Sequence, residues 1–182
     1  MLAVRPFKDI VVWGRNIEKV KAFIAHLSLP AGVTARAAMN VQDVMAVADV
    51  VCTVTSAATP ILKGDWLRPG THLNLVGSAV ATTAEVDSGC VKRARFYVDY
   101  REAAMAQAGE LLNAIKAGVV TAEHIVGEIG EVLIGKAPGR QSAADITVYK
   151  SLGISAQDLA AADLVYNAAL EAKAGIDVEL GS

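Results

Sequence analysis

The sequence alternates short β-branched runs with segments of helical periodicity along its whole length, and this alternation constrains the fold most. Runs typical of buried strands occupy residues 10–13, 33–38, 49–55, 72–77, 95–100 and 146–149. Helices are predicted at residues 16–27, 40–48, 86–94, 102–116, 121–135 and 155–173. Strands that alternate with helices form βαβ units, so we predict an α/β fold with a doubly wound parallel sheet.

Local signals mark where several of these helices begin. Asn16, Asn40 and Thr121 stand at positions where a side chain can cap the first turn. Ser155 and Asp158 resemble a capping box for the last helix. No repeat or linker interrupts the chain, so we expect one α/β domain with a helical C-terminal segment.

Composition excludes several classes of protein. The chain has 182 residues, of which 53% are hydrophobic and 20% charged, which excludes intrinsic disorder and suits one domain. A net charge of −2 gives no electrostatic footprint for nucleic acid. Cys52 and Cys90 are the only cysteines, too few for a disulfide scaffold or a zinc ribbon.

Nothing in the sequence predicts a signal peptide or a membrane span. The longest apolar region, residues 41–62, is broken by Asp43, Asp49 and Pro60, whereas a membrane helix needs about 20 apolar residues. We therefore expect a soluble, cytoplasmic protein that binds neither membrane nor nucleic acid.

Small and polar residues follow the predicted strands. In an open parallel sheet, ligands bind beyond the carboxyl ends of the strands, so these residues form the predicted binding crevice. Equally, strand ends are followed by loops, and loops are polar in any protein. The candidate cofactor-binding residues are Arg15, Asn16, Thr53, Val54, Thr55, Ser56, Val76, Gly77, Ser78, Asp99, Lys150 and Ser151.

Arg15 carries the most specific hypothesis. In dinucleotide-binding folds an acidic residue near this position binds the ribose 2′-hydroxyl, whereas an Arg accommodates a 2′-phosphate. The sequence Gly14-Arg15-Asn16 contains no acid, which favours NADP(H) over NAD(H). The alternative is that Arg15 is a solvated surface charge.

Other chemically active side chains give weaker signals. Asp99 either lines the crevice or caps the helix that begins near Glu102, and Lys150 either neutralises a bound anion or lies on the surface. Cys52 is expected to be buried within a strand and inert, and Cys90 to lie on a helix.

The three histidines are expected to be structural. His26 and His124 fall on predicted helices, and His72 starts a strand, at the end opposite the crevice. No pair of histidines has metal-ligand spacing, so no metal site is predicted, and the sequence identifies no catalytic residue.

The glycine-rich phosphate loop, G-x-G-x-x-G, is absent from the sequence. It would precede Ile10, where only nine residues remain, and residues 1–5 are interpreted as the last turn of the helix that follows such a loop. The first strand of a Rossmann-like sheet would therefore be missing between the strands at Ile10 and Asp49. We expect two unpaired edges and an apolar gap there, and a chain that is poorly stable or associates through those edges.

Seven motifs resemble the ornithine cyclodeaminase/mu-crystallin family in content, order and spacing. They are Val-Val-Trp-Gly-Arg-Asn (11–16), Thr-Val-Thr-Ser (53–56), Pro-Ile-Leu (60–62), Leu-Asn-Leu-Val-Gly-Ser (73–78), Tyr-Val-Asp-Tyr-Arg-Glu-Ala (97–103), Gly-Glu-Ile-Gly-Glu-Val (127–132) and Tyr-Lys-Ser-Leu-Gly (149–153). By this resemblance, residues 1–153 are a partial NAD(P)-binding Rossmann domain. Residues 154–182 are a C-terminal helix and tail that would pack on an absent N-terminal substrate and dimer domain.

The resemblance implies an NAD(P)-dependent reductase or dehydrogenase of cyclic imines or of imino or amino acids, with this chain as its cofactor-binding part. Full-length relatives are expected to be homodimers. In ornithine cyclodeaminases an Asp follows the strand that ends here at Gly77, but this chain has Ala79, which disfavours cyclodeamination. The remaining alternatives are a non-catalytic NADPH-binding protein of the mu-crystallin type and an inactive, N-terminally truncated fragment.

Overall fold

The computed structural model describes residues 1–176 and 178. The chain divides into two compact units, Met1–Leu152 and a second that begins at Gly153. Each is described here by itself. The functional roles assigned above to residues 1–153 and 154–182 remain predictions.

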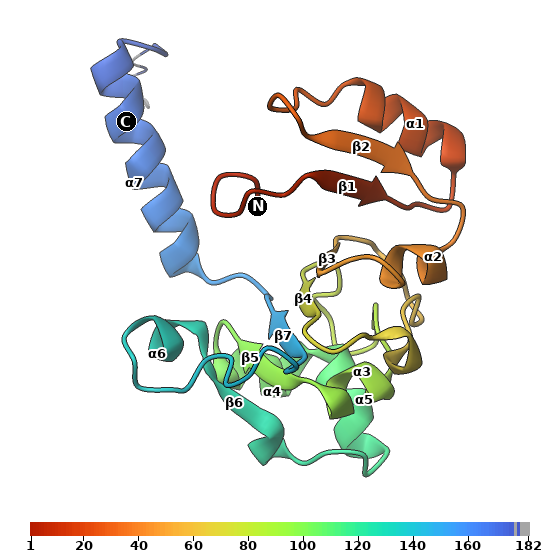
Figure 1. The fold of residues 1–182 in the computed structure, drawn as a ribbon. Coiled ribbons are helices and arrows are strands. Elements are labelled where there is room, and N and C mark those ends of the chain that lie inside the picture. The colour runs from red at the N-terminus through yellow and green to blue at the C-terminus, as the bar shows by residue number, and fades with distance from the viewer. Residues whose placement is uncertain (177, 179–182) are drawn as a thin grey trace. The chain divides into compact units, whose positions relative to one another are not determined.

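The first unit contains two parallel sheets among its described residues (Figure 1). The larger sheet has the strand order β3-β4-β7-β5-β6, and every neighbouring pair in it is parallel. The smaller sheet pairs β1 with β2, also in parallel. The strands are β1 (Asp9–Val12), β2 (Thr34–Ala37), β3 (Val50–Thr53), β4 (His72–Leu75), β5 (Arg95–Val98), β6 (Ile125–Glu128) and β7 (Thr147–Lys150).

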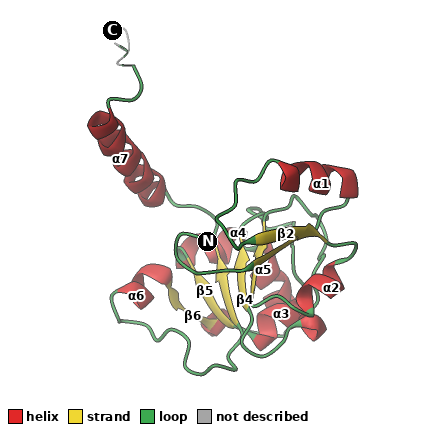
Figure 2. Ribbon diagram, turned by 45° about the horizontal axis from the view of Figure 1, so that its top comes forward, coloured by secondary structure: helices red, strands yellow, loops and turns green. Residues whose placement is uncertain are grey.

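Helices connect these strands, which confirms the predicted α/β class. Figure 2 shows helices in red and strands in yellow. The helices of the first unit are α1 (Ile17–Ala25), α2 (Val41–Met45), α3 (Ser88–Arg93), α4 (Arg101–Gln107), α5 (Gly109–Lys116) and α6 (Ile129–Leu133), with short 3-10 turns η1 (Gly64–Trp66) and η2 (Ala122–His124). The second unit contains the helix α7 (Ser155–Ala172).

The main hydrophobic core lies on one face of the larger sheet. Leu73, Leu75 and Phe96 alternate with residues of the opposite face along their strands, and all three are fully buried. Cys90 on α3 and Leu111 on α5 belong to the same buried cluster, so these helices cover that face. This packing fixes the strands whose carboxyl ends form the candidate site.

Two predicted helix caps are confirmed. The side chain of Asn16 accepts a hydrogen bond from the Lys19 amide at 3.0 Å and begins α1. Asn40 accepts one from the Asp43 amide at 2.8 Å and begins α2. The predicted capping box at Ser155 is wrong, because the N-cap of α7 is Ile154 and makes no side-chain cap bond.

The predicted helix over residues 121–135 is wrong. This segment forms η2, then strand β6, then the short helix α6. The apolar residues Ile125, Ile129 and Val132 have helical spacing, but Ile125 is buried and paired with Phe96 at the edge of the larger sheet. Pairing with β5 therefore overrides the local periodicity.

The predicted helix over residues 102–116 is divided into α4 and α5 at Ala108. The backbone of Gly109 passes so close to the 81–83 loop that a Cβ atom there would lie 1.9 Å from the carbonyl oxygen of Thr83. The helix therefore breaks where the backbone of Gly109 contacts this loop. The next residue, Glu110, is fully buried.

The predicted gap beside the strand at Ile10 is present. Within the described residues, β1 pairs only with β2, and β3 pairs only with β4, so each of them leaves one edge without a strand. The amides of Val4 and Arg5 both donate to the carbonyl of Met1, which makes the single helical turn expected before β1.

The close approach at Gly109 gives a stability prediction. The Gly109→Ala variant should lower the free energy of unfolding by about 1–3 kcal/mol, because the new methyl group meets backbone that cannot turn aside. The matched control is Gly130→Ala in α6, where a Cβ atom would meet nothing within 4 Å, and helix propensity should raise stability by about 0.5 kcal/mol. Urea unfolding measures both, and equal midpoints for the two variants would contradict the prediction.

Candidate functional site

A buried carboxylate joins the ends of β3 and β4. Glu85 is fully buried, and its Oε2 accepts hydrogen bonds from Thr53 Oγ1 at 2.6 Å and from the Gly77 amide at 2.9 Å. Its Oε1 accepts from the Thr55 amide at 2.6 Å and from Thr55 Oγ1 at 2.8 Å. Four donors compensate the desolvation of this carboxylate, so the chain segments after both strands are held in one arrangement.

A second pair of charged side chains lies behind Glu85. The amide of Glu85 donates to Glu110 Oε1 at 3.0 Å, and Lys150 Nζ lies 3.3 Å from Glu110 Oε2 as an ion pair without hydrogen-bond geometry. Lys150 Nζ also donates to the carbonyl of Ser78. Glu110 and Lys150 are fully buried, so each charge is compensated by the other and by fixed dipoles.

These contacts bring together half of the predicted crevice residues. Thr53, Thr55, Gly77, Ser78 and Lys150 lie in the hydrogen-bond network of Glu85 and Glu110. The Ser151 amide also donates to the Leu75 carbonyl at the same sheet edge.

Of the six remaining predicted residues, Asp99 is buried and the other five fall into two exposed groups. Val54, Ser56 and Val76 are exposed at the ends of β3 and β4, with Val54 73% exposed and Val76 45% exposed. Arg15 and Asn16 lie after β1, where Arg15 is exposed and Asn16 caps α1. Both groups are thus exposed to solvent, whereas Thr53, Thr55, Gly77, Ser78 and Lys150 are held by hydrogen bonds and an ion pair of the Glu85 and Glu110 network.

The structure decides one of the alternatives for Lys150. The interpretation of Lys150 as a surface lysine is wrong, because its side chain is fully buried and its ammonium contacts Ser78 and Glu110. A sequence pattern of β-branched residues ending in Lys cannot show this, since the partner carboxylate comes from α5.

Asp99 is buried at the end of β5, and its carboxylate binds backbone. Its Oδ1 accepts from the Tyr100 amide at 2.8 Å and its Oδ2 from the Leu152 amide at 2.6 Å. The N-cap of α4 is Tyr100, so the expected capping position is wrong by one residue. Asp99 instead ties the chain after β7 to the start of α4.

The two cysteines differ in environment. Cys90 is fully buried on α3, and burial raises the pKa of its thiol. Cys52 was predicted to be buried, and this is wrong: it is exposed because β3 has no strand on its outer side.

The histidines all make hydrogen bonds within the fold. His72 Nδ1 lies 2.7 Å from Thr147 Oγ1, and His124 Nε2 lies 2.7 Å from the carbonyl of Val91. His26 Nδ1 lies 2.7 Å from the carbonyl of Ala22. The histidine contacts agree with the expected structural roles, and among residues 1–176 and 178 no three His, Cys, Asp or Glu side chains gather as a metal site.

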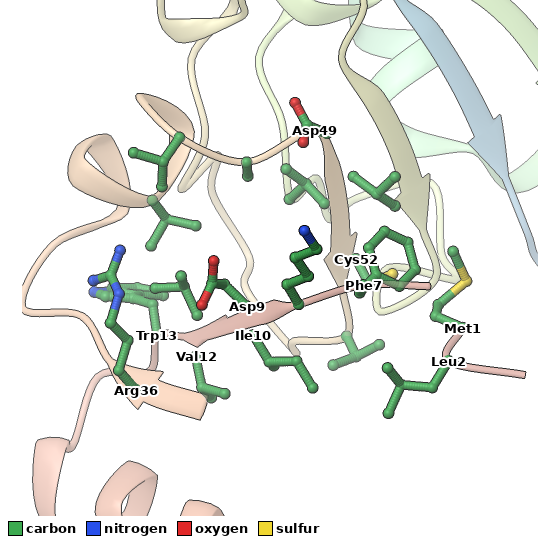
Figure 3. Close-up of a pocket in the computed structure, with 18 of the residues that line it drawn as sticks. Met1, Leu2, Phe7, Asp9, Ile10, Val12, Trp13, Arg36, Asp49 and Cys52 are labelled. Atoms are coloured by element: carbon green, nitrogen blue, oxygen red, sulfur yellow. The ribbon is translucent and has the colours of Figure 1, made fainter. Parts of the chain in front are cut away.

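A cavity of about 940 Å³ lies between β1 and β3 (Figure 3). Of the predicted cofactor-binding residues, Val54 lines it. Its lining comprises Met1, Leu2, Pro6, Phe7, Lys8, Asp9, Ile10, Val11, Val12, Trp13, Arg36, Val44, Val47, Ala48, Asp49, Val50, Val51, Cys52 and Val54.

Sequence reasoning missed Glu85 and Glu110. A signal was available for Glu85, because this acidic residue stands between Ala84 and Val86 in a run that is otherwise buried. Glu110 follows the Gly109 that breaks the helix. The donors to Glu85 come from Thr53, Thr55 and Gly77, and the charged partner of Glu110 is Lys150, so only the fold shows these contacts.

Residues 1–173 match the profile of the ornithine cyclodeaminase/mu-crystallin family. The chain belongs to this family. Among curated members, it is 38% identical over 161 residues to ketimine reductase mu-crystallin of Rattus norvegicus, covering 88% of this chain and 47% of that protein.

Two further family relatives match over a similar span. A Delta(1)-pyrroline-2-carboxylate reductase of Colwellia psychrerythraea is 36% identical over 166 residues, covering 90% of this chain and 52% of that one. The solved Delta(1)-pyrroline-2-carboxylate reductase of Thermococcus litoralis, in complex with NADH and L-proline, aligns with a TM-score of 0.91 and 30% identity, covering 97% of this chain and 55% of that one. The family member described here thus spans about half the length of the curated relatives it matches.

No described helix of this family member is both long and apolar enough to cross a membrane.

The contacts of Glu85 predict a local and a global effect. The Glu85→Gln variant should lower the free energy of unfolding by about 2–3 kcal/mol, because an amide nitrogen would face hydrogen-bond donors. Hydrogen exchange at the Thr55 and Gly77 amides should accelerate more than at the core amides of β5. The control is Glu171→Gln on the exposed surface of α7, which should change neither quantity. Equal acceleration of hydrogen exchange at the Thr55 and Gly77 amides and at the core amides of β5 would contradict the local effect.

His72 predicts a pH dependence of stability. Burial lowers the pKa of His72, a hydrogen bond to Asn74 opposes this, and nearby Arg140 lowers it further. Because the unfolded chain takes up this proton near pH 6.5 and the folded chain only at lower pH, the free energy of unfolding should fall as pH drops below about 6.5. The His72→Gln variant should show a smaller slope against pH in urea titrations, and identical slopes would contradict this assignment.

Proposed function

We propose that the chain is the cofactor-binding part of an NAD(P)-dependent reductase or dehydrogenase that acts on cyclic imines or on imino or amino acids. The names of its relatives, a ketimine reductase and Delta(1)-pyrroline-2-carboxylate reductases, support this reaction class. The Thermococcus litoralis relative was solved with NADH and L-proline, which supports a nicotinamide dinucleotide as cofactor.

The arrangement of the strand ends carries the proposal. Open parallel sheets bind ligands beyond their carboxyl ends, and here Glu85 fixes the ends of β3 and β4 by four hydrogen bonds. The exposed side chains of Val54, Ser56 and Val76 follow directly from these fixed segments. A preorganised edge with exposed apolar and hydroxyl groups suits the rings and sugars of a dinucleotide.

The charges at this edge also fit a dinucleotide. Arg15 is exposed after β1 and is available to a phosphate, whereas the buried Glu85 and Glu110 present no carboxylate to a ligand. The buried ammonium of Lys150 donates a hydrogen bond to the Ser78 carbonyl, and so contributes to this edge by positioning Ser78. When bound, the nicotinamide group would supply the hydride, and the residues of this chain would bind and orient the nucleotide.

Preference for NADP(H) is a separate part of the proposal. The segment Gly14-Arg15-Asn16 after β1 contains no acidic residue that could bind the ribose 2′-hydroxyl, and Arg15 can pair with a 2′-phosphate. NADH in the Thermococcus litoralis complex shows that NAD(H) is bound within the family, so the preference depends on Arg15 alone.

Ala79 favours reduction over cyclodeamination. It lies exposed in the loop after β4, where the resemblance places an Asp in ornithine cyclodeaminases. A methyl group offers no base or acid for a hydrolytic step. The substrate would therefore be an imine or an imino acid that accepts hydride.

Cofactor binding by the chain tests the proposal. NADPH should bind more tightly than NADH, measured by calorimetric titration of the full 182-residue chain. Arg15→Ala should weaken NADPH binding about tenfold to a hundredfold, the worth of a hydrogen bond to a charged group, and leave NADH binding nearly unchanged.

The matched control for this titration is Lys116→Ala, which removes an exposed cation at the end of α5 and should weaken neither cofactor. Equal losses for both cofactors in Arg15→Ala would overturn the NADP(H) preference. If neither NADPH nor NADH binds, the proposed cofactor-binding role of this chain is overturned.

A further inference from the structure

The loop that follows β4 has two buried ends and an exposed tip. We call residues 78–85 the 78–85 loop. Ser78 and Glu85 are buried, whereas residues 79–82 are exposed. Ser78 Oγ donates to the Thr83 carbonyl at 2.8 Å, and the Thr83 amide donates to the Val80 carbonyl at 3.1 Å, so the loop is closed on itself. The position of its tip therefore depends on how its ends are held.

The side chain of Glu110 reaches both ends of this loop. Its Oε1 accepts a hydrogen bond from the Glu85 amide at 3.0 Å. Its Oε2 lies 3.3 Å from Lys150 Nζ, and Lys150 donates in turn to the carbonyl of Ser78. One carboxylate on α5 thus holds one end of the loop directly and the other end through a buried ammonium.

Helix α5 begins directly against the 78–85 loop. A Cβ atom at Gly109 would lie 1.9 Å from the carbonyl oxygen of Thr83 and 3.1 Å from that of Ala81. Glycine therefore allows the backbone of α5 to contact the backbone of the loop, and the next residue, Glu110, then reaches the Glu85 amide. The contact leaves the loop no room to move toward α5.

The pair of buried charges specifies a position rather than adding much stability. Glu110 and Lys150 are both fully buried, and a buried ion pair can often be replaced by apolar side chains of similar size without loss of stability. Apolar side chains would, however, provide no partner for the Ser78 carbonyl or for the Glu85 amide. Holding these two backbone groups is therefore what the charges contribute.

The exposed tip of the loop carries only short, uncharged side chains. They belong to Ala79, Val80, Ala81 and Thr82. The tip follows the carboxyl end of β4, where open parallel sheets bind ligands. A ligand there would meet methyl groups, one hydroxyl and the main chain. Because such short side chains adjust little by rotation, these contacts depend on the position of the backbone.

We propose that Glu110 is a positioning residue for the bound dinucleotide, a role that rests on the proposed cofactor-binding function. It holds the 78–85 loop directly at Glu85 and through Lys150 at Ser78, and so sets the tip of the loop against the nucleotide. Glu110 does not touch the nucleotide, because its side chain is fully buried. Loss of the Glu110–Lys150 pair should therefore weaken cofactor binding in a chain that remains folded.

A paired variant tests this role in the full 182-residue chain. Glu110→Leu combined with Lys150→Met leaves neither charge of the pair buried, so the variant should fold, but the Ser78 carbonyl and the Glu85 amide lose their partners. NADPH should bind about tenfold more weakly or worse, the worth of roughly two hydrogen bonds, in calorimetric titrations under conditions where circular dichroism shows a folded chain. Without nucleotide, hydrogen exchange at the Thr83 and Glu85 amides should accelerate about tenfold relative to the amides of β5.

A milder variant decides the result if the paired variant fails to fold. Glu110→Gln keeps an oxygen for the Glu85 amide and removes only the charge opposite Lys150. Its affinity for NADPH should fall about threefold to tenfold, the worth of roughly one hydrogen bond. Hydrogen exchange should accelerate at the Thr83 amide, again relative to the amides of β5.

The matched control for a loss of stability is Ala114→Gly. Ala114 is fully buried on the same helix, and glycine at this position destabilises α5 without removing a contact to the 78–85 loop. The variant should lower the urea midpoint and leave unchanged both the NADPH affinity of the folded chain and the relative exchange at Thr83 and Glu85. A purely structural role of Glu110 would give this same pattern in the Glu110 variants.

Two results would overturn the proposal. One is unchanged NADPH affinity in a folded Glu110 variant, and the other is exchange at Thr83 that accelerates no more than exchange in β5. Failure of the proposed function is distinguishable, because it appears in the parent chain as absence of NADPH and NADH binding. The positioning of the nucleotide then falls with it, while the exchange measurements, which contain no nucleotide, still show whether Glu110 holds the loop.

Discussion

The buried carboxylate of Glu85 is the constraint on which the candidate site depends. An ionised carboxylate without solvent is tolerated only when donors surround it, and Thr53, Thr55 and Gly77 supply those donors. The same requirement fixes the segments after β3 and β4. The position of the exposed residues next to them therefore follows from the burial of one side chain.

The charges behind Glu85 extend this constraint to β7. Lys150 brings an ammonium into the interior from the end of β7, and Glu110 brings the compensating carboxylate from α5. The break of the helix at Ala108 places Glu110 there. Three elements distant in sequence thus share one buried network, and a change in any of them should act on the ends of the central strands.

The parts of the fold that depend on local sequence could be predicted, and the parts that depend on distant contacts could not. Asn16 caps α1 through its own neighbours, and the β-branched runs form strands as expected. Ile125 has spacing that suits a helix, yet pairing with β5 makes it part of a strand. Lys150 and Glu85 could be noticed as charged residues near apolar runs, but their partners come from elements that only the fold brings together.

The cavity between β1 and β3 and the candidate site meet in a single strand, β3. The inner edge of β3 pairs with β4 and leads into the segment held by Glu85, whereas its outer edge faces the cavity. Strand edges without partners open locally more easily than paired ones. Val54 lines the cavity and also follows Thr53 at the candidate site, so it lies next to both the fixed segment and the free edge. The buried carboxylate of Glu85 therefore stabilises the end of a strand whose outer edge no described strand pairs.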